Sequence, residues 1–159
     1  ENTIIEIATI VTEGDLTVVA EGPAFAISQP ESELAKMDDW NLTHHTENGL
    51  LDRVRNHGIP MAEAEALTIE FLREHCIEGI SPLCGNTIGQ DRRFLRRYMP
   101  ELHNFFHYRS VDVTSIKQLV DRWYQDLPRA TKPAGHRALD DIRGSIAELE
   151  HYREHIFRD

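Results

Sequence analysis

The chain begins with two segments in which hydrophobic and polar residues alternate. Residues 4–12 and 17–27 are rich in β-branched side chains and are separated by Glu13-Gly14-Asp15. Alternation of this kind around a turn-forming triplet predicts two strands joined as a hairpin. Helical patterns follow from residue 30 or 32 to 37 and from 38 to 54. The second is broken near Asn48-Gly49, and residues 57–60 predict a stop.

The best-patterned helix is predicted over residues 61–76. Its apolar stripe, widened by Leu67 and Phe71, consists of residues at helical spacing: Ala62, Ala66, Ile69, Leu72 and Cys76. This stripe predicts the face that the helix buries against the rest of the molecule.

The second half of the chain alternates short strands with helices. A buried strand is expected to end near Cys84, and a helix is expected to begin at Ile88 or Gly89 and to end before Pro100. Residues 108–112 predict a strand and 114–123 a helix, followed by a loop over 126–135 and a last helix over 137–157. A hairpin followed by alternating helices and strands predicts one domain with a three-layer α/β fold, in which helices flank a mixed sheet.

Composition narrows the class of protein. The 159 residues are 40% hydrophobic and 28% charged, which is typical of one globular domain. The two cysteines suggest no disulfide framework, and no apolar run approaches the ~20 residues of a membrane helix, so we expect a cytoplasmic protein without a membrane partner. A formal charge of −10 argues against a protein that grips long duplex nucleic acid through a basic field.

Two carboxylates stand at the start of predicted helices, and a histidine precedes the second. Asp91 shares a helical face with Leu95 and Tyr98, which predicts that it points towards the core. Asp141 begins the last helix, and His136 lies five positions before it. On a continuous helix this spacing turns two side chains roughly 140° apart. His136 therefore reaches the site of Asp141 only if it belongs to the preceding loop.

Each acid alone has two explanations. A carboxylate that faces inward is costly unless it is paired or binds a metal, whereas a carboxylate in a first turn is also favoured by the helix dipole. Together with His136, the two acids indicate a site that holds divalent cations and activates water for phosphodiester hydrolysis. His136 is then the candidate general base.

The last predicted helix contains a rival metal motif. His151-Tyr-Arg-Glu154-His155 matches H-x-x-E-H, the inverted zinc-protease pattern. Two histidines four residues apart make an edge for zinc. Short patterns of this kind often arise by chance in a charged helix, so the pattern alone is a weak indication.

Other residues are of types that bind nucleic acids, but their presence has a simpler structural explanation. Trp40 and Tyr108 can stack on bases, but for either one alone burial in the core is the simpler explanation. The basic group on the helix after Cys84 is typical of a solvated face and consists of Arg92, Arg93, Arg96 and Arg97.

Several blocks of the sequence resemble a known family. They are Met37-Asp-Asp-Trp40-Asn41, Cys84-Gly-Asn-Thr-Ile-Gly-Gln-Asp91-Arg-Arg-Phe-Leu95, Tyr98-Met-Pro-Glu-Leu102, Val111-Asp112-Val113 and His136-Arg-Ala-Leu-Asp-Asp141. In these blocks the chain is similar to the oligoribonucleases, a group within the DEDDh 3′→5′ exonucleases. The resemblance implies an RNase H-like fold and a cytoplasmic homodimer. It also implies hydrolysis of very short oligoribonucleotides, dinucleotides in particular, to nucleoside monophosphates.

The resemblance also assigns roles at the reaction centre. It implies two divalent ions, Mg²⁺ or Mn²⁺, held by four acids, of which Asp91 matches the third and Asp141 the fourth. His136 matches the general base. Substrate-binding roles follow by the same match for a further set. Trp40 matches a base-stacking residue, Tyr108 and His45 match residues that reach the site of the neighbouring subunit, and a cap on the 5′ phosphate is implied for Thr87, Arg109 and Thr114.

One part of the family pattern is missing. The first two acids of the family form Asp-x-Glu on a strand before the hairpin, and neither Glu1 nor Glu6 has an aspartate two residues earlier. We therefore expect the first strand and its acids to be absent from this sequence. That segment was cleaved or left out, or this sequence is a fragment of a longer protein. Two alternatives stay open: a DEDDh exonuclease for longer RNA or DNA 3′ ends, and a catalytically incomplete nucleotide-binding module.

Overall fold

The computed structural model describes residues 3–131 and 137–157. Its first element is the predicted hairpin, in which β1 (Glu6–Thr12) pairs antiparallel with β2 (Val18–Ala26), with Glu6 opposite Ala26. The Asp15 carboxylate accepts a hydrogen bond from the backbone N–H of Thr17 at 2.9 Å and shapes the turn. The pairing shifts between Ala8 and Ile10, which face Ala24 and Glu21, so the extra residue of this bulge lies in β2.

Three short helices follow the hairpin and confirm the predicted break. α1 (Glu31–Leu34) is a single turn, and α2 (Asp39–Glu47) and α3 (Leu50–His57) are separated at Gly49, which has a left-handed φ of 74°. The Asp38 side chain caps α2 by accepting the N–H of Asn41 at 2.8 Å. A satellite core forms where α1 and α3 meet the end of β2, and it contains Ala26, Leu34, Leu50, Leu51 and Val54.

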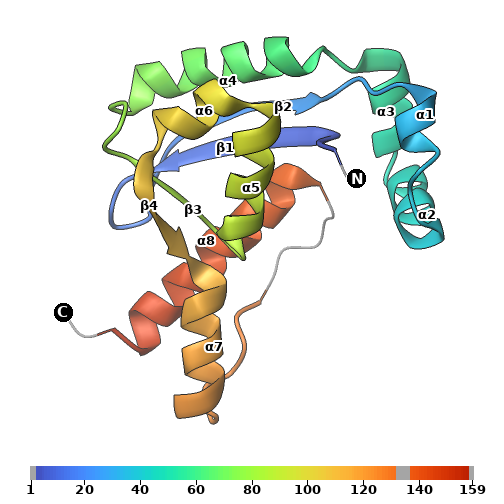
Figure 1. Cartoon of the computed structure of the whole chain (residues 1–159). Helices are drawn as coiled ribbons and strands as arrows, with labels where there is room; N and C mark the ends of the chain where they lie inside the picture. The colour runs from blue at the N-terminus through green and yellow to red at the C-terminus, as the bar shows by residue number, and fades with distance from the viewer. Residues whose placement is uncertain (1–2, 132–136, 158–159) are drawn as a thin grey trace.

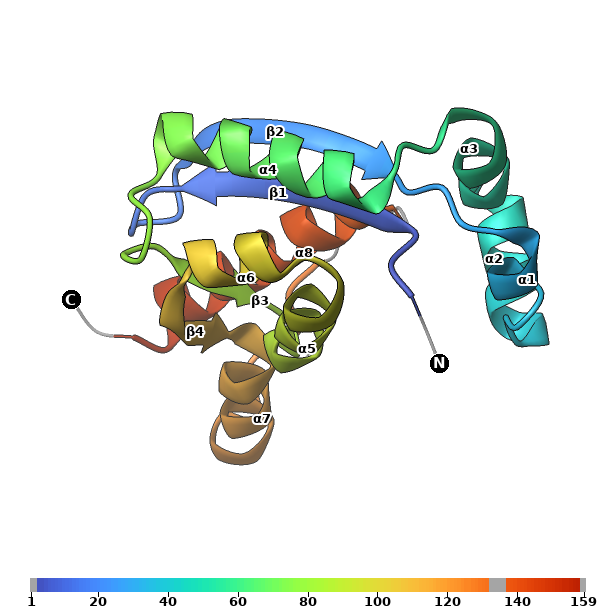
Figure 2. The same cartoon turned by 45° about the horizontal axis from the view of Figure 1, so that its top comes forward.

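α4 (Met61–His75) covers one face of the hairpin (Figures 1 and 2). Its buried residues include Ala64, Thr68 and Leu72, whereas Ala62 and Ala66 of the predicted stripe are exposed. The predicted stripe was therefore wrong in part. A hydroxyl can be buried here because Thr68 donates to the carbonyl of Ala64 at 2.7 Å, which leaves no donor unpaired.

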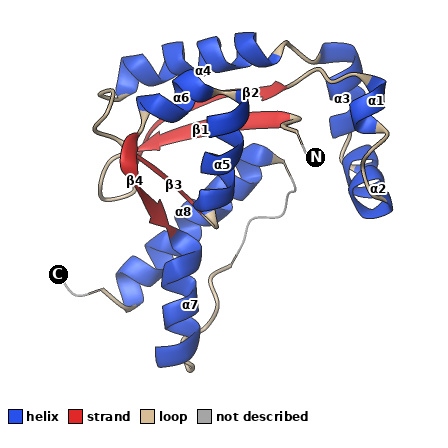
Figure 3. Ribbon diagram, in the orientation of Figure 1, coloured by secondary structure: helices blue, strands red, loops and turns tan. Residues whose placement is uncertain are grey.

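The second half supplies a parallel strand pair and four more helices. β3 (Pro82–Gly85) and β4 (His107–Asp112) pair in parallel, with Gly85 opposite Asp112. α5 (Ile88–Tyr98) and α6 (Pro100–Phe105) connect these strands. α7 (Val113–Trp123) follows β4, and α8 (Ala138–His155) ends the described chain. Figure 3 shows that the described strands pair two by two.

The α/β class with a small sheet flanked by helices is confirmed. α4 lies on one side of the hairpin and α8 on the other, where α8 contacts both β1 and β3 (Figures 1 and 2). The main core lies between the hairpin, α4, α5 and α6 and includes Ile27, Leu72, Met99, Leu102 and Phe105. β3 was expected to be buried, but its residues alternate between exposed and partly buried, because only β4 pairs with it in the described part.

None of the described helices is both long enough and apolar enough to cross a membrane.

Gly58 allows a close backbone approach that a larger residue would prevent. A Cβ atom at this position would lie 2.4 Å from the carbonyl oxygen of Val54 and 2.7 Å from the backbone nitrogen of Ser28. The neighbouring Ile59 exchanges hydrogen bonds with the end of β2, since Ser28 N–H donates to its carbonyl at 2.9 Å and its own N–H donates to Ala26 at 3.0 Å.

We predict that Gly58→Ala lowers the free energy of unfolding by about 1–3 kcal/mol, because backbone atoms must move apart to admit the methyl group. Urea denaturation measures the change. Gly14→Ala is the control, since a Cβ at Gly14 would meet nothing within 4 Å. Equal stability of Gly58→Ala and the wild type would contradict the close approach.

Candidate active site

The ends of the two parallel strands form the candidate site. β3 ends at Gly85 and β4 at its register partner Asp112, and α5 and α7 begin directly after them. Parallel neighbours end at the same edge of a sheet, so the positive N-terminal ends of both helices lie at this edge. Such an edge suits a negatively charged ligand.

One carboxylate oxygen joins the two helix starts. Asp112 Oδ1 accepts the backbone N–H of Thr87, which precedes α5, and that of Thr114 in the first turn of α7, each at 3.0 Å. The sequence contained Asp112 within a family block, but its role as an acceptor shared by two helices was missed. An aspartate two residues before the helix predicted over 114–123 is the signal that could have indicated this cap.

Thr87 has an unusual backbone that places its side chain. Its φ of 54° and ψ of 36° are left-handed, which is a strained conformation for a β-branched residue. In this conformation its hydroxyl lies 3.0 Å from that of Thr114. The structure therefore brings together two of the three residues that were expected to cap a phosphate.

Arg109, the third, lies on β4 beside Tyr108. Tyr108 is 73% exposed, and the Arg109 guanidinium lies over its ring at 5.2 Å from the centroid. Arg92 of α5 holds this part of β4, since its guanidinium donates to Ser110 Oγ at 2.6 Å and to the carbonyl of Arg109 at 2.9 Å. The prediction of a merely solvated face was wrong for Arg92, because its side chain spans from α5 to the strand.

Asp91 lies in the first turn of α5 and is exposed, so the prediction that it points towards the core was wrong. Leu95, one turn later, is buried, whereas Asp91 lies in the first turn, close to the end of β3 that precedes the helix. Partial burial of its carboxyl nevertheless raises the pKa of Asp91, and the nearby negative charge of Asp112 raises this pKa further. The charged carboxylate is therefore less favourable here than in an aspartate fully surrounded by water.

The start of α8 is held by a buried acid of β1. The side chain of Glu6 is 8% exposed; it accepts hydrogen bonds from the Arg137 guanidinium and from the backbone N–H of Ala138, the latter at 3.0 Å. Arg53 of α3 lies 3.6 Å from the same carboxylate. Asp141 is exposed in the first turn of α8. His136 lies outside the described residues.

The carboxylates of Asp91 and Asp141 have the donor chemistry that Mg²⁺ and Mn²⁺ prefer. Among residues 3–131 and 137–157, however, no group of three or more His, Cys, Asp or Glu side chains is arranged to hold a metal ion. The described residues by themselves therefore do not fit a complete two-metal site.

Trp40 and His45 lie on α2, which both views place apart from α5 and α7 (Figures 1 and 2). Trp40 is 70% exposed and stacks on His44 with ring centroids 5.0 Å apart and planes 9° from parallel. The expectation that Trp40 and Tyr108 are buried in the core was wrong for both. His45 is half-buried, and burial lowers its pKa.

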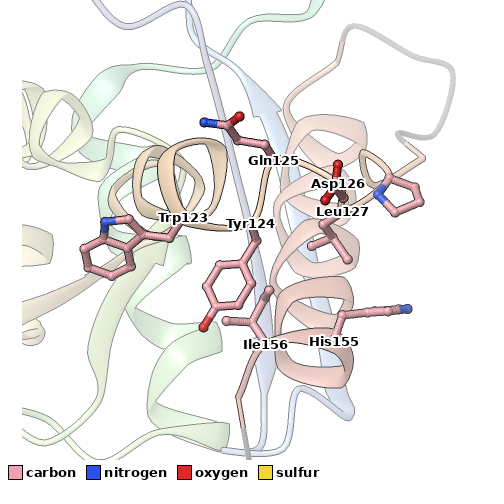
Figure 4. A pocket seen from close by; sticks show the side chains of 8 residues that line it. Trp123, Tyr124, Gln125, Asp126, Leu127, His155 and Ile156 are labelled. Carbon is pink, nitrogen blue, oxygen red and sulfur yellow. The ribbon is translucent and has the colours of Figure 1, made fainter.

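The histidines of the H-x-x-E-H pattern are engaged with the backbone. His151 Nε2 donates to the carbonyl of Pro128 at 2.8 Å, and His155 Nδ1 donates to the carbonyl of His151 at 2.8 Å. A hollow of about 360 Å³ lies beside them, between the ends of α7 and α8 (Figure 4). Tyr124 and Ile156 lie next to each other in its wall, and none of the predicted site residues lines it.

Comparison with known proteins identifies the class of this chain. The family model RNase_T, described as exonuclease, matches residues 1–149. The chain belongs to this exonuclease family.

Within that family the chain is similar to proteins named oligoribonuclease. The protein of Shewanella loihica is 56% identical over 156 residues, which are 98% of this chain and 86% of the relative. That of Idiomarina loihiensis is 54% identical over 158 residues, 99% of this chain and 86% of the relative. That of Coxiella burnetii is 56% identical over 154 residues, 96% and 84% of the two chains. The resemblance inferred from the sequence blocks is confirmed.

We predict that Asp112→Ala costs about 2 kcal/mol of unfolding free energy, because two helix-start N–H groups lose their acceptor at about 1 kcal/mol each. Chemical denaturation measures this loss. Asp38→Ala is the control: Asp38 accepts the backbone N–H of Asn41 at the start of a single helix, and the exposed side-chain amide of Asn41 at 3.0 Å. If the two variants lost the same stability, the shared-acceptor role of Asp112 would be wrong.

We predict that Asp91→Asn is more stable than the wild type at neutral pH in a chelator. Between the ordinary pKa of the unfolded chain and the raised pKa of the folded protein, folded Asp91 keeps a proton that the unfolded chain has released. The wild type therefore loses stability as pH rises through this range. The difference between the two proteins should shrink as pH falls below about 3.9, the ordinary value for aspartate. Thermal unfolding over a pH series measures it.

Asp15→Asn provides a comparison of opposite sign. Hydrogen bonds from Thr17 lower the pKa of Asp15, so its contribution to stability is present at neutral pH and is lost as pH falls through the lowered value. This variant should be less stable than the wild type at neutral pH and should approach it in acid. A common sign for the two variants would contradict the environments described.

Proposed function

We propose that this protein is a 3′→5′ exoribonuclease that hydrolyses very short oligoribonucleotides, dinucleotides in particular, to nucleoside 5′-monophosphates. Membership of the exonuclease family and the relatives named oligoribonuclease support a hydrolytic exoribonuclease for short substrates. The observation that carries the proposal is the hydroxyl pair of Thr87 and Thr114 at the N-terminal ends of two helices, with Asp91 on the first turn of one of them.

The hydroxyl pair would bind the 5′ phosphate of the substrate. Hydroxyl donors and two helix N-termini favour a phosphate dianion, and the Arg109 guanidinium would add a positive charge. A phosphate bound at this end limits the length of the substrate, because in a longer chain the corresponding phosphate is not terminal. Substrate length thus becomes a question of binding.

The family suggests dependence on divalent metals, and we propose Mg²⁺ or Mn²⁺ as a pair of ions. Asp91 and Asp141 would contribute two of the four acids, and the other two would belong to an Asp-x-Glu strand outside residues 1–159. β1 and β3 each have an edge without a strand partner among the described residues, so such a strand has a place to pair. When bound, the ions would supply charge neutralisation at the phosphate and acidify a coordinated water.

Other residues would bind the substrate or take part in proton transfer. His136 would accept the proton of the attacking water, and Trp40, which stacks on His44, would extend its stack onto a base. We further propose a cytoplasmic homodimer, in which Tyr108 and His45 reach the site of the neighbouring subunit. The exposed ring of Tyr108 supports a contact outside its own chain.

A length series in the full-length protein tests this function. We expect 5′-phosphorylated dinucleotides to be cleaved far faster than RNA of tens of nucleotides, and EDTA to stop both reactions. Asp141→Asn should reduce dinucleotide turnover by about a hundredfold or more, since even indirect partners of a metal cost 10–100-fold.

Asp140→Asn is the matched control for that series, because Asp140 is next in sequence and pairs with Arg143 at 3.2 Å. Normal turnover of Asp141→Asn would exclude its catalytic role. Equal rates on long RNA and dinucleotides would favour an exonuclease for longer 3′ ends, and binding without cleavage would favour a nucleotide-binding module.

A further inference from the structure

A buried carboxylate that the proposed reaction does not use lies behind the hydroxyl pair. Glu148 of α8 is 3% exposed, and it is the one charged side chain among the described residues with so little exposure. Asn86 Nδ2 donates to its Oε2 at 3.1 Å, and the hydroxyl of Tyr152 donates to its Oε1 at 2.8 Å. Lys117 Nζ of α7 lies 3.5 Å from Oε1. This carboxylate thus links α7, α8 and the turn after β3.

A continuous chain of hydrogen bonds runs from Glu148 to the candidate phosphate site. Asn86 Nδ2 also lies 3.4 Å from Thr114 Oγ1, which in turn lies 3.0 Å from Thr87 Oγ1. An amide nitrogen has two protons and a carboxylate only accepts, so Glu148 and Thr114 can take one proton each. The contact with Glu148 therefore determines which end of the Asn86 amide faces the hydroxyls.

The orientation of Asn86 has a chemical consequence at Thr114. Because Thr114 Oγ1 accepts a proton from Asn86, its own hydroxyl proton is left to be donated outwards or to Thr87. In either arrangement one hydroxyl of the pair is a donor aimed away from the network. Such a pair suits an acceptor-only group such as a phosphate oxygen and suits a hydroxyl ligand less well.

We propose that Glu148, acting through Asn86, is a positioning residue that sets the Thr87–Thr114 hydroxyl pair as donors for a terminal phosphate. This inference rests on the proposed function, which places the 5′ phosphate at that pair. Lys117 balances the negative charge of the buried carboxylate, and Tyr152 satisfies its second oxygen. Burial and the neighbouring Glu148 together raise the pKa of Tyr152, as expected for a hydroxyl that stays a donor.

The experiment compares two dinucleotide substrates that differ only at the 5′ end, one with a 5′ phosphate and one with a 5′ hydroxyl. Asn86→Ala and Glu148→Leu each break the chain of hydrogen bonds. For both variants we expect KM for the phosphorylated substrate to rise roughly tenfold, about what one hydrogen bond to a charged group contributes. KM for the hydroxyl substrate should stay unchanged, and the double variant should lose no more than either single one.

Tyr152→Phe is the matched control, because it removes a contact of Glu148 and leaves Asn86 in place. It is expected to lower stability and to keep the wild-type preference for the phosphate. Asn86 is only partly buried, so Asn86→Ala decides the question if Glu148→Leu does not fold.

The outcomes distinguish the proposed phosphate site from the proposed positioning role of Glu148. A wild type without preference for the phosphorylated substrate would overturn the phosphate site of the proposed function. A wild type with this preference and variants that retain it would overturn the positioning role alone. An equal rise in KM for both substrates would mean that Glu148 and Asn86 are only structural residues, and it would overturn the inference.

Discussion

The carboxylate of Asp112, shared between the backbone N–H groups of Thr87 and Thr114, is the contact on which the site depends. The parallel pairing of β3 and β4 brings the starts of α5 and α7 to one edge. A single acceptor oxygen for the N–H groups at both helix starts then holds these two starts close together. The hydroxyl pair and the first turn with Asp91 take their places from it.

Acidic side chains also accept the backbone N–H groups at other helix starts in this chain. Glu6 accepts the first N–H of α8, and Glu65 Oε1 accepts the N–H groups of Glu101 and Leu102 at the start of α6, at 2.8 and 3.0 Å. In each case an acid from one element satisfies the unpaired amides at the start of another, where the helix dipole favours negative charge. Part of the net charge of −10 therefore connects elements of the fold.

Local patterns predicted the elements well, because their signals act over a few residues. The turn at residues 13–15 and the break at Gly49, with its left-handed backbone, are of this kind. What failed depends on partners distant in sequence. Which face of α4 is buried is decided by the hairpin and α6, so Ala62 and Ala66 could not reveal their exposure. Arg92 looked like a solvated residue because its acceptors lie on β4, beyond the next helix.

The site itself shows why its residues can be recognised more easily than their roles. Thr87 is held in a left-handed conformation in which glycine would be unstrained, but glycine would lack the hydroxyl that meets Thr114. Asp91 likewise keeps a carboxyl whose pKa is raised by burial and by Asp112, which an amide would relieve. Both features lower the stability of the folded chain, and both lie at the sheet edge where we propose that a phosphate and divalent cations bind. Strain and charge repulsion that coincide at one place are explained by ligand binding better than by folding.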